Sequence, residues 1–336
     1  MSGTIRGGPI LINPYIKLHA NDDVFIARDN IPAGAIADDR TRRRITTIGL
    51  VMFLFSASSS ILADDDADSL AAELANPNTV LGQMNFPIDY VSYKGDAPGA
   101  DNEDSWRFSF QPVLPYPLAE GVNLFVRPLI PILYEQPIPT VSGGDTSPPD
   151  GAGFGTADAN SNFFDSDLEL GDISFDIAIG KTLPSKTILL GGMVGTLDTA
   201  TDDNVGLGQT LLGPEVAVAQ LFNWGVLGVL VSHQWDVAGD SDFDTSITGG
   251  QYFYAYNLSK GWQIQAQPTF SYNHEAKSGD EKWTLPVGVG ITKVTRFGKT
   301  PWKFNVQYWH YVKQADSIGP DFQVRFQLGP VVPLPW

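Results

Sequence analysis

The chain has 336 residues, with 21 basic and 38 acidic side chains, a formal net charge of −17 and no cysteine. This acidic balance argues against a nucleic-acid partner, because binding to phosphates requires Lys and Arg to displace counterions. The lack of cysteine excludes a disulfide scaffold, Cys-ligated metals and thiol catalysis. Charged residues make up 18% of the chain, below the roughly 25% of ordinary soluble domains. Together with abundant Gly and aromatic residues, this composition favours a β protein with alternating faces.

A leader precedes the part of the chain that is expected to fold. Arg42-Arg43-Arg44 is followed by the apolar stretch Ile45 to Phe55, by SASSS and by Ile61-Leu62-Ala63. A basic head, a short apolar stretch and a small-residue exit predict a secretory signal peptide over 42–63, cleaved after Ala63. The alternative is an N-terminal membrane anchor, but the apolar stretch is shorter than the roughly 20 residues that a spanning helix needs. Residues 1–41 are interpreted as an overextended start or a disordered extension.

From Val80 onward, apolar and polar side chains alternate in long segments separated by breaks. Near 261–274, for example, one parity is Trp262, Ile264, Ala266, Pro268, Phe270 and Tyr272, and the other is Gln263, Gln265, Gln267, Thr269, Ser271 and Asn273. Successive side chains of a strand point to opposite faces, so each segment predicts a strand with one apolar and one polar face. Twelve such segments are found, near 80–93, 104–118, 121–136, 168–183, 187–200, 208–222, 224–236, 247–258, 261–274, 281–296, 301–314 and 319–330.

The connections between these segments alternate between short and long. The short ones are 118–121, 183–187, 223, 259–260 and 297–300, and the long ones are 94–103, 137–167, 201–207, 237–246, 275–280 and 315–318. Acidic residues gather at the long connections, and lysines flank the short ones. Outer-membrane barrels have short periplasmic turns and longer outer loops, and aromatic residues at strand ends suit the membrane interfaces. We therefore predict an all-β fold, a transmembrane antiparallel up-and-down β-barrel of about 12 strands over 80–336, in the outer membrane of a Gram-negative bacterium. The terminal Trp336 resembles the assembly signal of such barrels.

Three motifs near the start of the predicted barrel resemble a known family. Leu74-Ala75-Asn76-Pro77 is followed by Pro112-Val113-Leu114-Pro115-Tyr116-Pro117-Leu118 and by Asn123-Leu124-Phe125-Val126-Arg127-Pro128-Leu129-Ile130-Pro131. This succession resembles the bacterial outer-membrane "transporter" family named after meta-pathway phenol-degradation operons, over most of residues 70–336. The resemblance implies a barrel that moves small, often aromatic or apolar, compounds across the outer membrane, and it marks no reaction.

The predicted lumen is narrow and polar. Twelve strands lie between the eight that leave a barrel filled by side chains and the sixteen or more that leave an aqueous channel. By parity, the side chains expected to line the lumen and to set its selectivity are Arg107, Arg127, Asp172, Asp176, Glu215, Gln263, Gln265, Gln267, Lys303, Asn305, Gln307 and Arg325. The basic residues fall on predicted strands 2, 3, 11 and 12 and the acidic ones on strands 4 and 6, so a basic wall is expected to face an acidic wall. The alternative is that these charges only neutralise each other and rigidify the barrel.

Two further features bear on passage through the barrel. Pro112, Pro115, Pro128 and Pro131 fall in the adjacent predicted strands 2 and 3, where they are expected to mark bulges or a break that opens a lateral window for an apolar solute. Residues 64–79 are interpreted as an N-terminal periplasmic segment. Within it, Asp68 to Asn76 could form a short helix that plugs the mouth of the barrel, although nothing in the sequence fixes its position.

These observations predict a passive or weakly gated porin-like channel for the diffusion of small organic compounds, including aromatic or hydrophobic ones. The alternatives are an outer-membrane lipid-modifying enzyme and a plugged structural or surface-binding barrel. Catalysis is disfavoured, because Ser232 and His233 are strand neighbours that point to opposite faces, and His274 near Ser271 lacks an orienting acid. No enzymatic activity, cofactor or metal site is expected. The expected partners are outer-membrane lipids and lipopolysaccharide, the barrel assembly machinery and a small-molecule solute.

Overall fold

The computed structural model describes residues 10–13, 16–18, 64–139, 163–239, 241 and 243–335. The predicted signal peptide and the terminal Trp336 lie outside the described residues, as does most of 1–41. Within 1–41, only β1 (Ile10–Asn13) and β2 (Ile16–Leu18) are described, and they pair with each other as antiparallel strands. None of the described helices combines the length and the apolar character that a bilayer-crossing helix requires.

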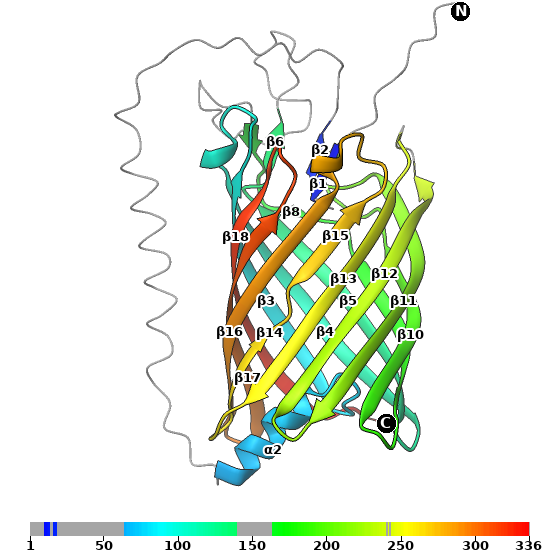
Figure 1. The fold of residues 1–336 in the computed structure, drawn as a ribbon, viewed down its shortest axis with the longest axis vertical. Coiled ribbons are helices and arrows are strands. Elements are labelled where there is room, and N and C mark those ends of the chain that lie inside the picture. The colour runs from blue at the N-terminus through cyan, green and yellow to red at the C-terminus, as the bar shows by residue number, and fades with distance from the viewer. Residues whose placement is uncertain are drawn as a thin grey trace, which may run out of the picture. The chain divides into compact units, whose positions relative to one another are not determined.

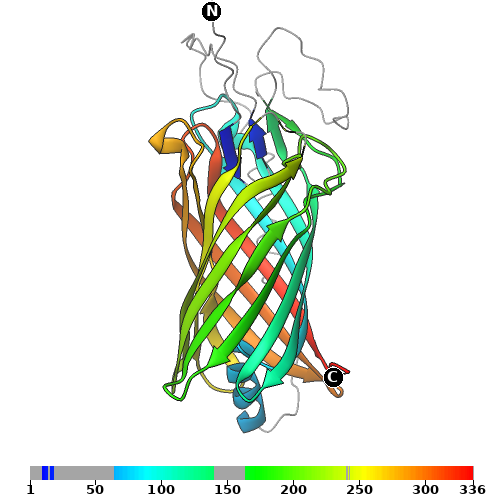
Figure 2. The same ribbon diagram turned by 90° about the vertical axis from the view of Figure 1, so that its right-hand side faces the viewer.

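A single antiparallel sheet closes on itself to form a barrel (Figures 1 and 2). Its strands are β3 (Gly82–Lys94), β4 (Asp104–Ala119), β5 (Val122–Tyr134), β9 (Ser174–Thr182), β10 (Thr187–Thr196), β11 (Gln209–Phe222), β12 (Gly225–Gly239), β13 (Ser246–Asn257), β14 (Trp262–Ala266), β15 (Thr269–Asn273), β16 (Trp283–Phe297), β17 (Thr300–Lys313) and β18 (Gly319–Val332). β14 and β15 share one position in the wall, so the wall has twelve positions. Pairing of β18 with β3 completes the cylinder. The predicted barrel of about twelve strands is confirmed.

The smaller elements lie around this wall. β8 (Glu169–Leu170) pairs with the end of β5, and β6 (Pro137–Pro139) pairs with β7 (Phe163–Asp165) in a separate two-stranded sheet. Two short 3-10 helices, η1 (Ala100–Asn102) and η2 (Gly279–Glu281), lie in the connections before β4 and β16. The one described α-helix is α2 (Asp64–Ala75).

The alternation in the sequence becomes an apolar outer face and a largely polar inner face. In β9, Ile177 and Ile179 are 37% and 51% exposed, whereas Ala178 between them is 1% exposed. In β17, Tyr308 is exposed while Asn305 and Gln307 are buried. An apolar side chain on the outside of a closed barrel has no other part of the protein to pack against, so lipid is the environment that accepts it.

The two ends of the barrel differ as the sequence predicts. Five tight connections, 119–122, 182–187, 222–225, 257–262 and 297–300, lie at one end, which we call the short-turn end. Figure 2 shows these hairpins beside α2. Their geometry requires a left-handed backbone at several positions, among them Gly121 at φ +68° and Lys186 at φ +63°. The other end, the long-loop end, holds η1, η2 and the β6–β7 pair.

The strand boundaries depart from the prediction at two places. The predicted strand 168–183 is divided into β8 and β9, and Asp172 lies between them outside any strand. The predicted strand 261–274 is interrupted at Gln267 and Pro268, where a proline cannot donate to the ladder.

Pro112 and Pro128 interrupt the β4–β5 ladder without shifting it, whereas a register shift lies between Pro117 and Ala119 at the short-turn end. Pairing runs from Trp106 opposite Tyr134 to Phe110 opposite Ile130, and it resumes with Leu114 opposite Val126. The offset is the same on both sides of the gap, so Pro112 faces Pro128, and neither has a backbone donor. The expected bulge is therefore not found at this pair. The ladder is broken for three residues on each strand, and the lateral window stays a prediction.

Candidate functional site

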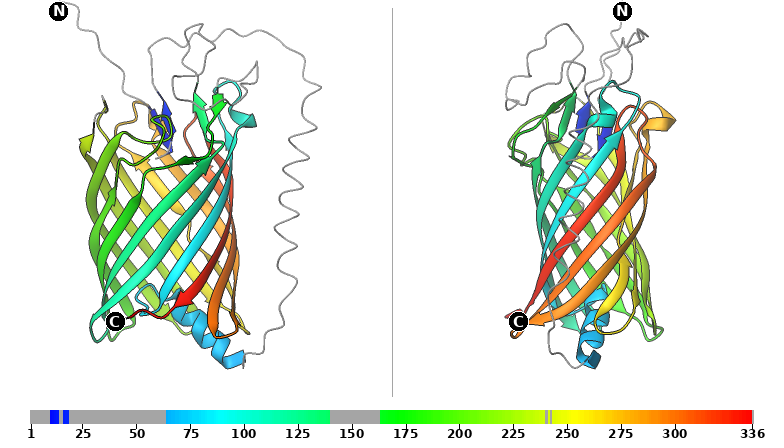
Figure 3. Two further views of the ribbon diagram at one scale, coloured as in Figure 1. Left: turned by 180° about the vertical axis from the view of Figure 1, so that it is seen from behind. Right: turned by 90° about the vertical axis from the view of Figure 1, so that its left-hand side faces the viewer.

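Residues 64–79, which we call the strap, cross the short-turn end of the barrel. Asp68 Oδ1 accepts a hydrogen bond of 2.6 Å from the backbone N–H of Gly261 in the β13–β14 turn. At the other end of the strap, Asn78 Nδ2 donates to the carbonyl of Gly121 at 3.0 Å and to the hydroxyl of Thr182 at 2.7 Å. The strap is thus attached to turns that lie at different points of the rim. Figure 3 shows α2 at this end, near the end of β18.

The apolar face of α2 packs against the inside of the wall. Ala71 and Leu74 form a buried cluster with Val294 of β16 and Val331 of β18. Ala75 packs against a second buried cluster, which is Ile188, Ala219, Val226 and Ala255. Gln263 Nε2 also donates to the carbonyl of Ala71 at 3.0 Å. The helix predicted from Asp68 to Asn76 is therefore present, with the bounds Asp64–Ala75, and it packs at the short-turn mouth of the lumen.

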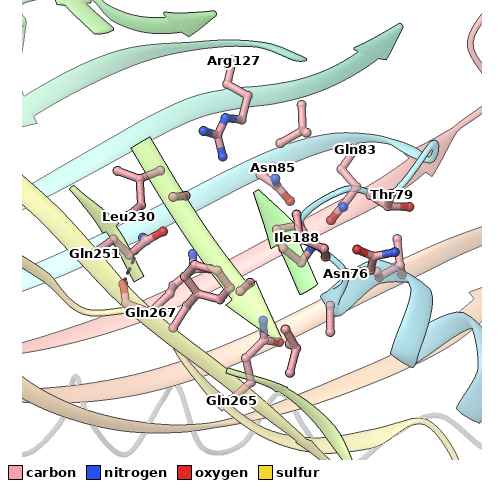
Figure 4. A pocket seen from close by; sticks show the side chains of 18 of the residues that line it. Asn76, Thr79, Gln83, Asn85, Arg127, Ile188, Leu230, Gln251, Gln265 and Gln267 are labelled. Carbon is pink, nitrogen blue, oxygen red and sulfur yellow. Dashed lines mark hydrogen bonds between the residues drawn. The ribbon is translucent and has the colours of Figure 1, made fainter. Parts of the chain in front are cut away.

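A cavity of about 160 Å³ lies in the lumen beside the strap. Figure 4 shows Asn85, Gln83 and Arg127 reaching into it from one side, and Gln251, Gln265 and Gln267 from another. Another part of the wall is apolar and includes Ile188, Leu190, Ala217, Val226, Leu230 and Phe253, and Lys303, Gln111 and Gln327 also line the cavity. The C-terminal end of the strap, including Asn76 and Thr79, forms part of the cavity boundary.

Arg127 is the centre of one charged cluster in the lumen. Its Nε donates to Asp176 Oδ1 at 2.6 Å, and its Nη2 lies 3.4 Å from Glu215 Oε1. The three residues come from β5, β9 and β11. One guanidinium therefore holds two carboxylates, and this contact brings together three of the predicted lumen residues.

Asp89 of β3 is the centre of a second charged cluster. Its Oδ2 accepts from Arg107 Nη2 at 2.7 Å, and its Oδ1 accepts from Arg325 Nε at 2.6 Å and from Gln323 Nε2 at 2.8 Å. The guanidinium carbon of Arg325 lies 4.6 Å from the centroid of the Trp309 ring. This cluster holds two cations and one carboxylate, the reverse of the Arg127 cluster.

Amide side chains connect the inner faces of β14 to β17. Asn305 Nδ2 donates to the Thr292 hydroxyl at 2.7 Å, and that hydroxyl donates to Gln265 Oε1 at 2.9 Å. Gln307 Nε2 donates to Asn305 Oδ1 at 2.6 Å, while its Oε1 accepts from the backbone N–H of Gln267 at 3.0 Å. Buried polar groups require such partners, and a connected network makes this part of the lining rigid.

The structure changes the expected division into a basic and an acidic wall. Each predicted arginine is paired with a carboxylate, so the charges are organised as two compensating clusters. Asp172, predicted to line the lumen, is fully buried and instead accepts hydrogen bonds from the backbone N–H groups of Thr199, Ala200 and Leu207. Asp89 was not among the predicted lumen residues. Its parity with Gln83 and Asn85 on the same strand is the signal that identifies it.

Ser246 Oγ lies 3.4 Å from His233 Nε2 at the long-loop end, but among the described residues no carboxylate is hydrogen-bonded to the imidazole of His233 or His274. Thr248 Oγ1 lies 2.8 Å from His233 Nδ1 and 2.8 Å from His274 Nε2, so a hydroxyl stands between the two imidazoles. Thr248 is opposite His233 and Tyr272 in the ladder. Ser232 and Ser271, with the opposite parity, point to the other face of the sheet.

No family model and no curated relative matches the chain. Among solved structures, an outer membrane channel from Pseudomonas putida F1 aligns with a TM-score of 0.53 and 14% identity, covering 75% of this chain and 96% of that one. The NanC porin aligns with a TM-score of 0.43 and 10% identity, covering 75% of this chain and all (100%) of that one. The CymD monoaromatic hydrocarbon channel aligns with a TM-score of 0.39 and 10% identity, covering 83% of this chain and 95% of that one. At 14% identity, the similarity to the Pseudomonas putida channel shows a shared fold.

The closed wall of twelve positions, the apolar outer face and the polar lumen define a transmembrane β-barrel of the bacterial outer membrane. The predicted fold class and compartment are confirmed.

Proposed function

We propose that the chain is a gated outer-membrane channel for the diffusion of small organic compounds, including aromatic or hydrophobic ones. The observation that carries this proposal is the cavity of about 160 Å³, which joins an amide-lined wall to an aliphatic wall inside the lumen. A pore that conducts only hydrated ions does not require an aliphatic wall. A site for a molecule with both polar and apolar parts needs both walls.

The strap supports the gated form of the proposal. It contacts the turns at Gly121, Thr182 and Gly261, and it packs into the mouth with small apolar clusters. In the orientation usual for outer-membrane barrels, short turns face the periplasm. The strap would then close the periplasmic side, and a solute would leave the lumen only when the strap moves.

Several narrower assignments belong to this proposal. The resemblance to the family named for meta-pathway phenol degradation fits a channel of this kind. The twelve predicted lumen residues, with Asp172 set aside as a loop-organising residue and Asp89 added, are the candidates for setting selectivity. The signal peptide over 42–63, lipopolysaccharide around the barrel and the assembly machinery as a partner are likewise proposals.

The test is solute flux into liposomes that contain the purified protein. Swelling rates are measured with phenols, aromatic acids and sugars, for the whole mature chain and for a variant that lacks 64–79. We expect slow flux of small aromatic solutes through the intact protein and faster flux through the truncated one. Protein-free liposomes and heat-unfolded protein are the controls. If neither form conducts solute or current, the channel proposal is wrong and the plugged structural barrel is favoured. Hydrolysis of phospholipid by the detergent-solubilised protein, lost in His274→Ala, would favour the enzyme.

A further inference from the structure

We propose that the lumen cavity binds a small organic molecule with one carboxylate, and that Lys303 holds the carboxylate. The proposal deepens the proposed function, on which it rests, by naming the class of solute. It depends on four observations: the charge of Lys303, the absence of acidic residues in the described lining, the neighbouring amides, and the size of the apolar part of the cavity.

Lys303 is a buried cation that lines the cavity. It lies on β17, is 7% exposed, and has the same parity as the inward residues Asn305 and Gln307. Within the described part of the chain, no ion pair or side-chain hydrogen bond involves its ammonium. An ammonium removed from water without a counter-charge is costly, so a buried lysine of this kind favours a bound anion.

The other cation of the lining is already neutralised. Arg127 lies 2.6 Å from Asp176 and 3.4 Å from Glu215, so its positive charge is compensated within the protein. No aspartate or glutamate is among the described residues that line the cavity. Leu74 and Ala75, at the C-terminal end of α2, also line the cavity, and a helix C-terminus carries a partial negative charge. Lys303 is therefore the group in the lining that would gain most from an anionic ligand.

Amide groups next to Lys303 complete a carboxylate site. Gly329 of β18 pairs with Lys303 in the ladder, and a Cβ built on Gly329 would lie 2.5 Å from Asn85 Oδ1. Gly329, which has no side chain, therefore lies between Lys303 and Asn85. Asn85 Oδ1 is buried and has no hydrogen-bond partner among the described residues. Because the two ends of an amide are exchanged by a half-turn of the side chain, Asn85 can offer its NH₂ to a carboxylate oxygen, and Gln83 lies beside it on the same strand (Figure 4).

The size and polarity of the rest of the cavity define the body of the ligand. A dry cavity of roughly 150 Å³ is known to accept a benzene ring, and this cavity has a volume of about 160 Å³. Its aliphatic side, which includes Ile188, Leu190 and Leu230, suits a ring or a short branched chain. Burial of that body adds the hydrophobic contribution to binding, while Lys303 and the amides fix the orientation of the charged end.

The experiment compares three ligands of equal size and different charge. Benzoate, benzyl alcohol and benzylammonium are titrated into the full mature chain in detergent by calorimetry. The variants are Lys303→Met, which removes the charge, and Lys303→Arg, which keeps it. Lys181→Met is the matched control, because it removes an exposed lysine near the same end of the barrel. The heat-dependent shift of folded barrels on SDS gels shows that each variant is folded.

We expect wild type to bind benzoate at least tenfold more tightly than benzyl alcohol and to bind benzylammonium the least. Lys303→Met should abolish the preference for benzoate, while Lys303→Arg and Lys181→Met should keep it. Equal binding of benzoate and benzyl alcohol by wild type would overturn the proposal, and so would an unchanged benzoate preference in Lys303→Met. Liposome flux separates the two proposals. If benzyl alcohol crosses the liposome membrane but benzoate is not bound preferentially, only the carboxylate-site proposal is wrong. If benzoate is bound but no solute crosses, only the channel proposal is wrong.

Discussion

The carboxylate of Asp68 accepts a hydrogen bond from the backbone N–H of Gly261, and this single contact ties the start of the strap to the β13–β14 turn. Gly261 adopts φ +72°, and a Cβ at this position would lie 2.5 Å from the carbonyl oxygen of Val294 and 3.2 Å from Cβ of Ala67 in α2. The turn therefore comes close to the helix because it has no side chain there. The contact is a place where the closed state of the mouth can be weakened without disturbing the wall.

Replacement of Asp68 by Ala should favour the open mouth. Loss of one hydrogen bond costs about 1 kcal/mol, which corresponds to roughly a fivefold shift toward the open state. We expect a higher frequency of open events in planar bilayers, with the current of each event unchanged. Asp66→Ala is the control, since Asp66 is exposed on the same helix. Identical recordings for Asp68→Ala and wild type would show that this contact does not hold the gate.

Replacement of Asp89 by Asn should destabilise the barrel and make the lumen more anion-selective. Arg107 and Arg325 would lose their shared carboxylate, and breaking a buried ion pair typically costs about 3–5 kcal/mol. Unfolding in urea, followed by gel mobility, measures the stability, and the reversal potential under a KCl gradient measures the selectivity. The control is Asp321→Asn, which removes a partly exposed pair with Lys94 and should cost about 1 kcal/mol or less. Equal losses in the two variants would contradict the buried role of Asp89.

Replacement of Arg127 by Met should produce the opposite change in selectivity. Asp176 and Glu215 would then face each other without a cation, so the lumen should prefer K⁺ over Cl⁻. The reversal potential under the same gradient should move in the direction opposite to that of Asp89→Asn. Adding Asp176→Asn and Glu215→Gln to Arg127→Met should return it toward the wild-type value. A cation preference that persists in the triple variant would place its origin elsewhere in the lumen.

The Pro112–Pro128 pair allows a test of the side exit. A double variant, Pro112→Val with Pro128→Val, returns two backbone donors to the interrupted part of the β4–β5 ladder. If the gap is a route into the lipid, release of an apolar solute should slow while the ion conductance stays the same. Hydrogen exchange at residues 111–113 and 127–129 reports whether the ladder has closed. Slower hydrogen exchange at these residues with unchanged solute release would rule out the side exit.

The alternation of side chains carries most of the fold in this chain. A period of two predicts strands, their inward and outward residues, and the division into short and long connections, because each of these follows from local geometry. The boundaries of β10 to β13 and β16 to β18 agree with the predicted segments to within a few residues. The same parity predicts the candidate lumen residues. Asp172 does not follow it, because a connection between β8 and β9 interrupts the predicted strand at that residue.

The pairing of charges could not be read from the chain. Arg107, Asp89 and Arg325 meet because the last strand closes onto the first, and their relative height depends on the stagger of the closed sheet. Parity assigns each side chain to a face of the sheet but does not give its position along the barrel axis. It therefore predicts two opposed walls of charge, whereas the structure has two clusters in which the charges are paired. The position of the strap depends in the same way on contacts between residues far apart in the sequence.

The attachment points of the strap also imply an order of events during assembly. Asn78 contacts Gly121 and Thr182, and Asp68 contacts Gly261, so its binding surface exists only after both halves of the sheet have met. The strap, although it precedes the barrel strands in the sequence, must therefore dock after the sheet has closed. A nascent barrel would therefore pass through a stage in which its wall is closed and the strap is still undocked. In the proposed gated channel, a strap that cannot dock would leave the lumen permanently open.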